Sequence, residues 1–289
     1  AVTGNCSPKD FETMMQLTYL TFTAPRRDDD AFASYKNRSK AELQNMDLNP
    51  SSSFSDSITS TLYSKHPRTL RIKADMVDKM NYDKILSMYQ DRFKDASDFT
   101  FILVGNVDVE AVKPLIESYL GSLPSINRKE TFKDNHIAMR KGICKNEFIR
   151  QQETPKVNNF ICYSGTCKYN LRNEILMSMT DQLLNFIYTE KVREDEGGTY
   201  GVYPMGQLIK YPTEKAVLQI FFNTAPDKQE KLIKIIYDEA EAFAKNGPDE
   251  ASLNKVKEYM LKKHSEDLKE NGYWLNSIDE YLYTGIDPV

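Results

Sequence analysis

The chain has 289 residues, of which 40% are hydrophobic and 28% are charged, and its formal net charge is −4. This is ordinary globular composition, and the length favours about two domains. Neither charge sign forms a long stripe, and the longest apolar runs fall far short of the roughly 18 residues that a membrane-spanning helix needs, so we expect neither nucleic-acid binding nor a membrane span.

The first part of the sequence predicts helices around one strand. Residues 7–10, Ser-Pro-Lys-Asp, supply a cap, a first-turn proline and an acidic side chain, which predicts a helix to about residue 24. Residues 99–104, FTFILV, are rich in β-branched and aromatic residues and apolar on both faces, which predicts a central strand. Further helices are predicted at about residues 28–45, from about residue 51, at about 81–93 and at about 109–119.

A polar stretch separates the first part from the second. Residues 125–136, SINRKETFKDNH, lack periodicity, as expected of a linker. We therefore predict a first domain at residues 1–124, a linker at residues 125–136 and a second domain at residues 137–289.

The second part mixes strands with long helices. Strands are predicted at about residues 143–150, 156–164, 199–210 and 215–223, and helices at about 171–192, 226–246 and 248–270. Residues 99–120 and 216–240 each run from an apolar strand through an Asn-containing turn to a helix. This weak repeat predicts an α+β fold of two related domains, each a mostly antiparallel sheet with helices packed on one face.

Histidine motifs offer no metal site. His66, His136 and His264 are far apart in the sequence, and neither H-E-x-x-H nor H-x-x-E-H occurs. His264 begins an H-x-E triplet like that of zinc deaminases, but P-C-x-x-C is missing, so an exposed helical histidine is expected. Phosphate-loop and G-x-S-x-G motifs are also missing, and we predict no metal ligand and no cofactor-binding residue in this chain.

The cysteines do not identify a compartment. Cys6, Cys144, Cys162 and Cys167 form no C-x-x-C pair and are too few for a disulfide scaffold. Burial statistics for this residue type lead us to expect mostly buried free thiols.

The most unusual segment is residues 192–202, VREDEGGTYGV. It places Arg193 at the end of a long predicted helix and Tyr200 at the start of a predicted strand, joined by an acidic, glycine-rich turn that can bring both side chains to one edge of the domain. Arg193 offers fixed donors for a peptide carbonyl or carboxylate, and Tyr200 offers a hydroxyl donor for a developing oxyanion. The structural alternative is an arginine favoured by the helix dipole and a half-buried strand tyrosine.

The spacing of Arg193 and Tyr200, Arg-x6-Tyr, resembles the C-terminal half of the insulinase/pitrilysin family of zinc metallopeptidases, the inverted zincins. Residues 102–108, ILVGNVD, and the helix end at residues 119–124, YLGSLP, are similar to another hallmark of that family. So are residues 7–10 ahead of their Leu-, Tyr- and Phe-rich helix. Together these similarities cover most of residues 5–285.

The resemblance implies two homologous halves, each of two α+β domains, that close around a peptide. It implies that Arg193 orients the substrate backbone, that Tyr200 stabilises the tetrahedral intermediate, and that zinc is bound by the N-terminal half of the same polypeptide. This chain lacks the zinc motif, the strands expected before the first helix and an expected final helix. It is therefore expected to be an excised piece that is inactive by itself.

Two hypotheses follow from the resemblance. In the first, the chain is the C-terminal, non-zinc-binding half of a zinc metalloendopeptidase, which binds peptide substrates and completes the active site for proteolysis. In the alternative, it is a proteolytically inactive scaffold or assembly subunit of the same fold. Bacterial relatives in this family are often periplasmic, so the periplasm is the expected compartment.

Overall fold

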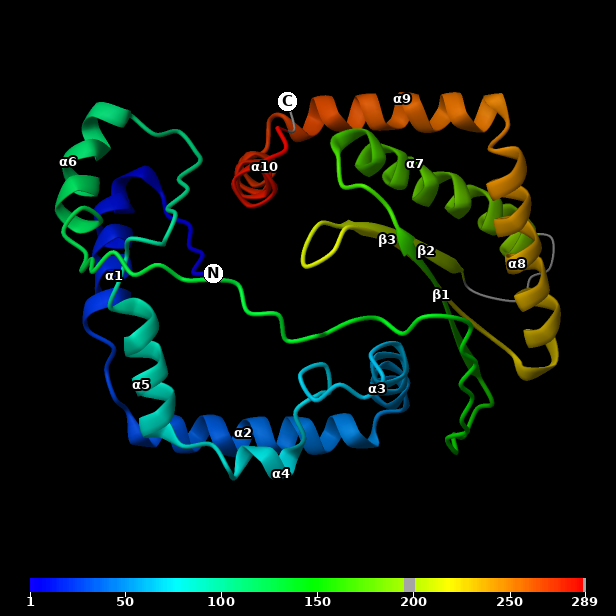
Figure 1. The fold of residues 1–289 in the computed structure, drawn as a ribbon, viewed down its shortest axis with the longest axis horizontal. Coiled ribbons are helices and arrows are strands. Elements are labelled where there is room, and N and C mark those ends of the chain that lie inside the picture. The colour runs from blue at the N-terminus through cyan, green and yellow to red at the C-terminus, as the bar shows by residue number, and fades with distance from the viewer. Residues whose placement is uncertain (195–200, 288–289) are drawn as a thin grey trace. The chain divides into compact units, whose positions relative to one another are not determined.

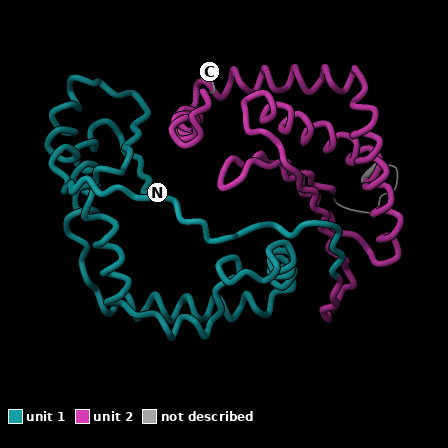
Figure 2. Tube along the Cα trace, viewed as in Figure 1, with its two compact units in different colours: residues 1–146 teal, residues 147–289 magenta. Residues whose placement is uncertain are grey.

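The computed structural model describes residues 1–194 and 201–287, with the side chains of residues 193 and 194 outside the description (Figure 1). The chain divides into two units, Ala1–Asn146 and Glu147–Val289 (Figure 2). Described residues of the first unit form helices and loops, and those of the second form a small antiparallel sheet with helices. The predicted α+β class is confirmed. No helix among the described residues is long and apolar enough to cross a membrane.

Several helices of the first unit begin at side chains that accept hydrogen bonds from free backbone N–H groups, whereas α1 and α4 begin without such a cap. Asp28 accepts from Ala31, Asn81 accepts from Lys84, and Asp108 accepts from Ala111. The elements are a 3-10 turn at Pro8–Asp10, α1 (Phe11–Thr23), α2 (Asp29–Leu48), α3 (Pro50–Leu62), α4 (Ala74–Val77), α5 (Tyr82–Phe93) and α6 (Val109–Tyr119).

The strand predicted at residues 99–104 is wrong, because this segment pairs with no neighbouring strand in the described chain. Its apolar side chains instead pack against helices. The ring of Phe22 on α1 lies 4.8 Å from that of Phe99 and 5.8 Å from that of Phe101, and 4.9 Å from that of Phe93 on α5. Edge-to-face contacts of this kind stabilise aromatic clusters. The apolar pattern therefore reflects packing on helices rather than a sheet.

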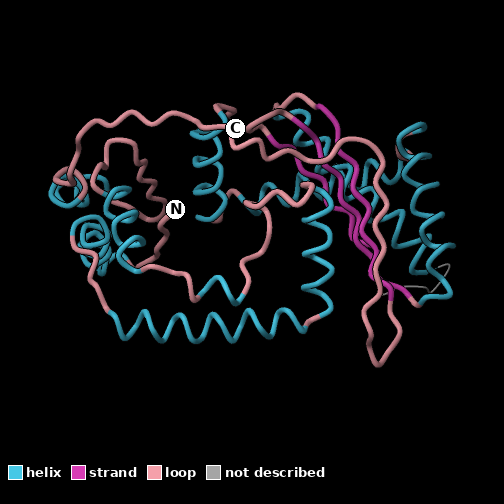
Figure 3. The backbone as a smooth tube through the Cα atoms, turned by 60° about the horizontal axis from the view of Figure 1, so that its bottom comes forward, coloured by secondary structure: helices cyan, strands magenta, loops and turns pink. Residues whose placement is uncertain are grey.

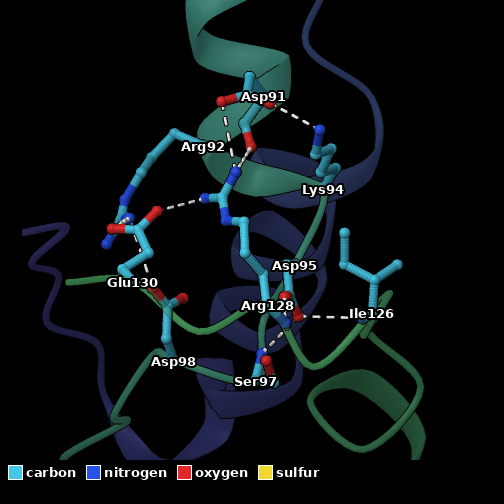
Figure 4. Close-up of polar contacts among 9 residues, drawn as sticks. All are labelled: Asp91, Arg92, Lys94, Asp95, Ser97, Asp98, Ile126, Arg128 and Glu130. Carbon is cyan, nitrogen blue, oxygen red and sulfur yellow. Dashed lines mark hydrogen bonds and ion pairs between the residues drawn. The ribbon is translucent and has the colours of Figure 1, made fainter.

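The segment predicted as a linker, residues 125–136, lies within the first unit. Asp95 is fully buried, and its carboxylate accepts backbone N–H groups from Ser97 at 3.0 Å, Ile126 at 3.1 Å and Arg128 at 2.6 Å (Figure 4). Burial alone would raise the pKa of Asp95, but these hydrogen bonds prevail and hold the pKa below its ordinary value. One buried carboxylate thus fixes the start of the polar stretch.

We expect Asp95→Asn to lower the Tm of the first unit by about 5–10 °C, because the amide nitrogen would face a buried backbone donor that the carboxylate now satisfies. The lowered pKa means that the stabilisation by Asp95 is present at neutral pH and lost as pH falls. Thermal unfolding followed by circular dichroism measures both effects. Asp75→Asn, at a side chain 71% exposed, is the matched control, and equal losses in the two variants would contradict the role of Asp95.

The second unit is built on three antiparallel strands in the order β1-β3-β2 (Figure 3). The strands are β1 (Val157–Thr166), β2 (Val202–Ile209) and β3 (Lys215–Thr224). The helices are α7 (Leu171–Tyr188), the π-helix η2 (Thr189–Glu194), a 3-10 turn at Pro226–Lys228, α8 (Gln229–Asn246), α9 (Glu250–Asp267) and α10 (Asn271–Thr284). The strand predicted at residues 143–150 is wrong, since that stretch is irregular and Ile143 and Ile149 are exposed.

The core of the second unit lies between the sheet and two helices, α7 and α8. Side chains at most 3% exposed meet there from all of these elements and from η2: Leu184, Tyr188, Val192, Val202, Ile220, Phe222, Leu232 and Ile236. Alternate residues of β3 point into this core, as expected of a sheet covered on one face. This core includes Val192 and Val202, the described residues on either side of the segment that carries Arg193 and Tyr200.

The cysteines differ from expectation in their burial. All four are free, but Cys6 and Cys144 are exposed, and Cys162 and Cys167 are only half-buried. Burial raises the pKa of the Cys162 thiol. The expectation of mostly buried thiols is therefore wrong. It rested on residue averages, and Cys6 and Cys144 lie in irregular segments that bury little.

Candidate functional site

The two predicted catalytic residues lie at the edge of what the structure describes. The backbone of Arg193 belongs to η2, directly after α7, but its side chain is outside the description. Tyr200 lies outside the described residues. The part of the site that the structure describes is therefore its frame, by which we mean η2 before residues 193–201 and β2 after them.

Both ends of this segment are fixed in the same core. Val192, directly before Arg193, is fully buried, and Val202, two residues after Tyr200, is 3% exposed. Both belong to one cluster with Phe222 of β3, which pairs with Val202 in the sheet register. A chain that leaves and re-enters one core has its two ends close together. The described flanks of the segment therefore lie in one cluster, and the placement of Arg193 and Tyr200 at one edge stays a prediction.

The helix that leads to Arg193 is held against α8. Tyr188, the last residue of α7, is fully buried, and its hydroxyl donates to the backbone carbonyl of Ile236 at 3.3 Å. Burial raises the pKa of Tyr188, so this hydroxyl stays protonated at neutral pH. The helix then widens into the π-helical turn of η2, a feature that is frequent at functional sites.

The strand that follows Tyr200 is fixed to the same helix through a glycine. A side chain at Gly206 on β2 would place its Cβ 2.3 Å from Sδ of Met177 and 2.6 Å from Oδ1 of Asp181, both on α7. The missing side chain lets α7 approach, and the Gly206 N–H donates to the Asp181 carboxylate at 2.5 Å. Burial raises the pKa of Asp181 to about 6, against the opposing effect of this hydrogen bond. The sequence analysis did not identify Asp181.

We expect the ionisation of Asp181 to lower the unfolding free energy of the second unit by about 1 kcal/mol between about pH 5 and about pH 7.5. This value is reduced for solvent screening, because the side chain is only half-buried. Since the folded pKa is raised, the stabilisation is complete below the unfolded pKa and is lost as pH rises through about 6. Asp181→Asn should remove this contribution, so that stability falls by about 1 kcal/mol less than in wild type over the same pH range, as measured by urea unfolding. A variant that keeps the wild-type pH dependence would contradict the assignment, and Asp279→Asn, at an exposed carboxylate, is the control.

A sequence profile described as the Peptidase M16 inactive domain matches residues 79–260. The chain belongs to this family. The match covers more than half of the chain and includes all of α5, α6, α7 and α8. The resemblance to the C-terminal half of insulinase/pitrilysin peptidases, and the corresponding fold, are confirmed.

Relatives of this M16 domain include proteins named as zinc proteases. The Arabidopsis thaliana protein "Zinc protease PQQL-like" is 24% identical over 93% of this chain and 30% of its own length. The Escherichia coli protein "Probable zinc protease PqqL" is 22% identical over 96% of this chain and 30% of its own length. This chain therefore spans about 30% of the length of the curated relatives it matches.

Solved structures show the same fold. The crystal structure of the periplasmic protease PqqL from Escherichia coli matches 97% of this chain and 31% of its own, with a TM-score of 0.79 and 19% identity. A protease from Helicobacter pylori matches 96% of this chain and 68% of its own, with a TM-score of 0.77 and 14% identity.

The described part of the chain presents no cluster of side chains suited to a zinc ion. Within residues 1–194 and 201–287, no group of three or more His, Cys, Asp or Glu side chains is arranged to hold a metal. The described residues therefore do not fit a zinc site, and no catalytic step is assigned to a metal in this chain.

A cavity of about 200 Å³ lies between α7, α8 and the turn before α9. Leu183, Ile187 and Phe243 give it an apolar wall, and Glu239 and Asp249 lie at its polar side. The Asp249 carboxylate is already used, because it accepts the backbone N–H of Ser252 as the cap of α9. The cavity lining has no histidine, lysine or cysteine, and its Asp249–Ser252 pair serves as the cap of α9, so we do not take it as the candidate site.

Proposed function

We propose that this M16 domain is the non-zinc-binding part of a zinc metalloendopeptidase, in which it binds peptide substrates and completes the active site. The observation that carries the proposal is the anchoring of Val192 and Val202 in one core, which presents residues 193–201 as a single short segment. In this proposal Arg193 donates hydrogen bonds to the peptide backbone and Tyr200 donates its hydroxyl to the oxyanion of the tetrahedral intermediate.

The partner in this proposal is an N-terminal, zinc-bearing half of the same polypeptide. Support comes from the zinc proteases that the chain resembles, which are about three times as long as the matching region. The zinc ion would be held by that half. This chain then contributes substrate-binding groups and is inactive by itself.

Substrate peptides would bind in an extended conformation by pairing with the edge of the sheet. β3 is central, so β1 and β2 are the edges of the described sheet. Edge strands offer unpaired backbone groups, which bind a peptide without strict demands on its sequence. Pro204 removes one N–H donor from β2, which makes β1 the more complete edge. The proposed compartment is the bacterial periplasm, where the Escherichia coli relative is found by its description.

A reconstitution experiment tests this function. A quenched fluorescent peptide library is incubated with zinc and with this chain alone, the zinc-bearing half alone, or both together. Hydrolysis that requires both parts is the expected result. Hydrolysis by this chain alone would contradict the proposal, and no hydrolysis by a mixture that associates, as shown by analytical ultracentrifugation, would favour an inactive scaffold.

A further inference from the structure

The last turn of α10 is attached to the rest of the second unit by polar contacts at two points. The hydroxyl of Tyr169, in the loop before α7, lies 3.0 Å from Oε1 of Glu174 on α7 and within hydrogen-bonding distance of Oε1 of Glu280 on α10. The ammonium group of Lys210, directly after β2, donates to the backbone carbonyl of Thr284, the last residue of α10. These contacts join α10 to α7 and to the end of β2.

The first contact needs one more proton than the side chains carry when both glutamates are ionised. A phenol hydroxyl has a single hydrogen, so Tyr169 can donate to only one of the two carboxylates. Tyr169 is 7% exposed, which limits the access of water to its hydroxyl. If one glutamate is protonated, it donates to the phenol oxygen while the phenol donates to the other glutamate. Each oxygen in the contact then has a partner.

Burial and the neighbouring carboxylate favour holding that proton. Burial and the negative charge of Glu280 raise the pKa of Glu174. Burial and the two neighbouring carboxylates also raise the pKa of Tyr169, so the phenol keeps its own hydrogen. The Lys210 ammonium acts in the opposite direction, because a nearby cation favours ionised carboxylates. It lies 6.0 Å from the centre of the Tyr169 ring and is hydrogen-bonded to the Thr284 carbonyl.

We propose that Glu174 and Glu280 share a proton through the Tyr169 hydroxyl, and that this proton holds α10 against the second unit. The sign of the pH dependence follows from the pKa of Glu174, which is raised in the folded state. The contact is complete at acidic pH and is lost as pH rises through the folded pKa, when two carboxylates face each other. Helix α10 is therefore a pH-sensitive element, docked in acid and released toward alkaline pH.

Hydrogen exchange of the intact chain tests the proposal, with mass spectrometry following residues 271–284 between about pH 5 and about pH 8. After correction for intrinsic rates, protection of α10 should fall severalfold as pH rises, while protection of α9 stays constant. Glu174→Gln, whose neutral amide can still donate to the phenol oxygen, should keep α10 protected across the whole range. Glu280→Gln should do the same, and circular dichroism verifies that each variant is folded.

Three results would overturn the proposal. Protection of α10 that does not change with pH would do so, as would an equal pH dependence in wild type, Glu174→Gln and Glu280→Gln. The third is a carbon-13 NMR titration of the Glu174 carboxyl that is the same in wild type and in Glu280→Gln. Glu258→Gln, at an exposed glutamate on α9, is the matched control and should behave as wild type.

Discussion

Tyr200→Phe, introduced into the longer protease that we propose, should lower kcat by about a hundredfold or more and leave KM and bound zinc almost unchanged. The variant keeps the ring and removes only the hydroxyl that we propose to donate to the oxyanion. Loss of one such donor costs about 10²–10³ in kcat, because the interaction is made only in the transition state. Steady-state hydrolysis of a quenched peptide, with zinc measured by atomic absorption, gives all three quantities.

Tyr203→Phe is the matched control for Tyr200→Phe. Tyr203 lies on β2, three residues further along, and its side chain is exposed. Its variant should keep wild-type kcat. Equal activity in wild type and Tyr200→Phe would contradict the role of Tyr200, whereas a loss of zinc in Tyr200→Phe would indicate a structural rather than a catalytic effect.

Phe222→Ala should destabilise the second unit by about 3–5 kcal/mol. Phe222 is fully buried and lies in the core that holds both Val192 and Val202. Its removal leaves a cavity between β3 and the two anchors, so the frame of residues 193–201 should loosen together with the fold. Urea unfolding of this chain, followed by circular dichroism, measures the loss.

Phe221→Ala is the control for Phe222→Ala. Phe221 is the preceding residue of β3, points to the opposite face of the sheet and is only half-buried. We expect it to cost clearly less stability. If the two variants lose the same free energy of unfolding, the cluster at Phe222 is not the main core of the unit.

The helices were predictable wherever local signals agree with packing. Asp108 caps α6 as its position in the sequence indicates, and Pro226 begins the turn that leads into α8. Helix α10 was not predicted because it begins with Asn271 and Gly272, a pair typical of turns. Short-range patterns therefore identified most of the helices but not this one.

The helix-packed loop at residues 99–104 was not predictable, because an apolar run does not reveal what it packs against. Residues 99–104 have the composition of a central strand, yet Phe99 and Phe101 pack on Phe22 of a helix. The buried role of Asp95 was equally hidden, since its three donors come from residues 97, 126 and 128. Long-range contacts of this kind leave no local pattern.

For the candidate site, the sequence predicted which residues to consider but not how they are held. Arg193 and Tyr200 came from spacing and resemblance, whereas the anchors Val192 and Val202 and the contact of Asp181 with Gly206 appear only in the folded chain. A half-buried carboxylate on α7 has no distinguishing sequence signal, because acidic residues are common on helix surfaces.

The most direct test of the central claim is a crystal structure of the proposed longer protease with zinc and a non-hydrolysable peptide that mimics the tetrahedral intermediate. We predict the Tyr200 hydroxyl at about 2.7–3.1 Å from the oxygen that represents the oxyanion, with the Arg193 guanidinium hydrogen-bonded to the peptide backbone. A complex in which both side chains point away from the bound peptide would contradict the proposed role of this chain.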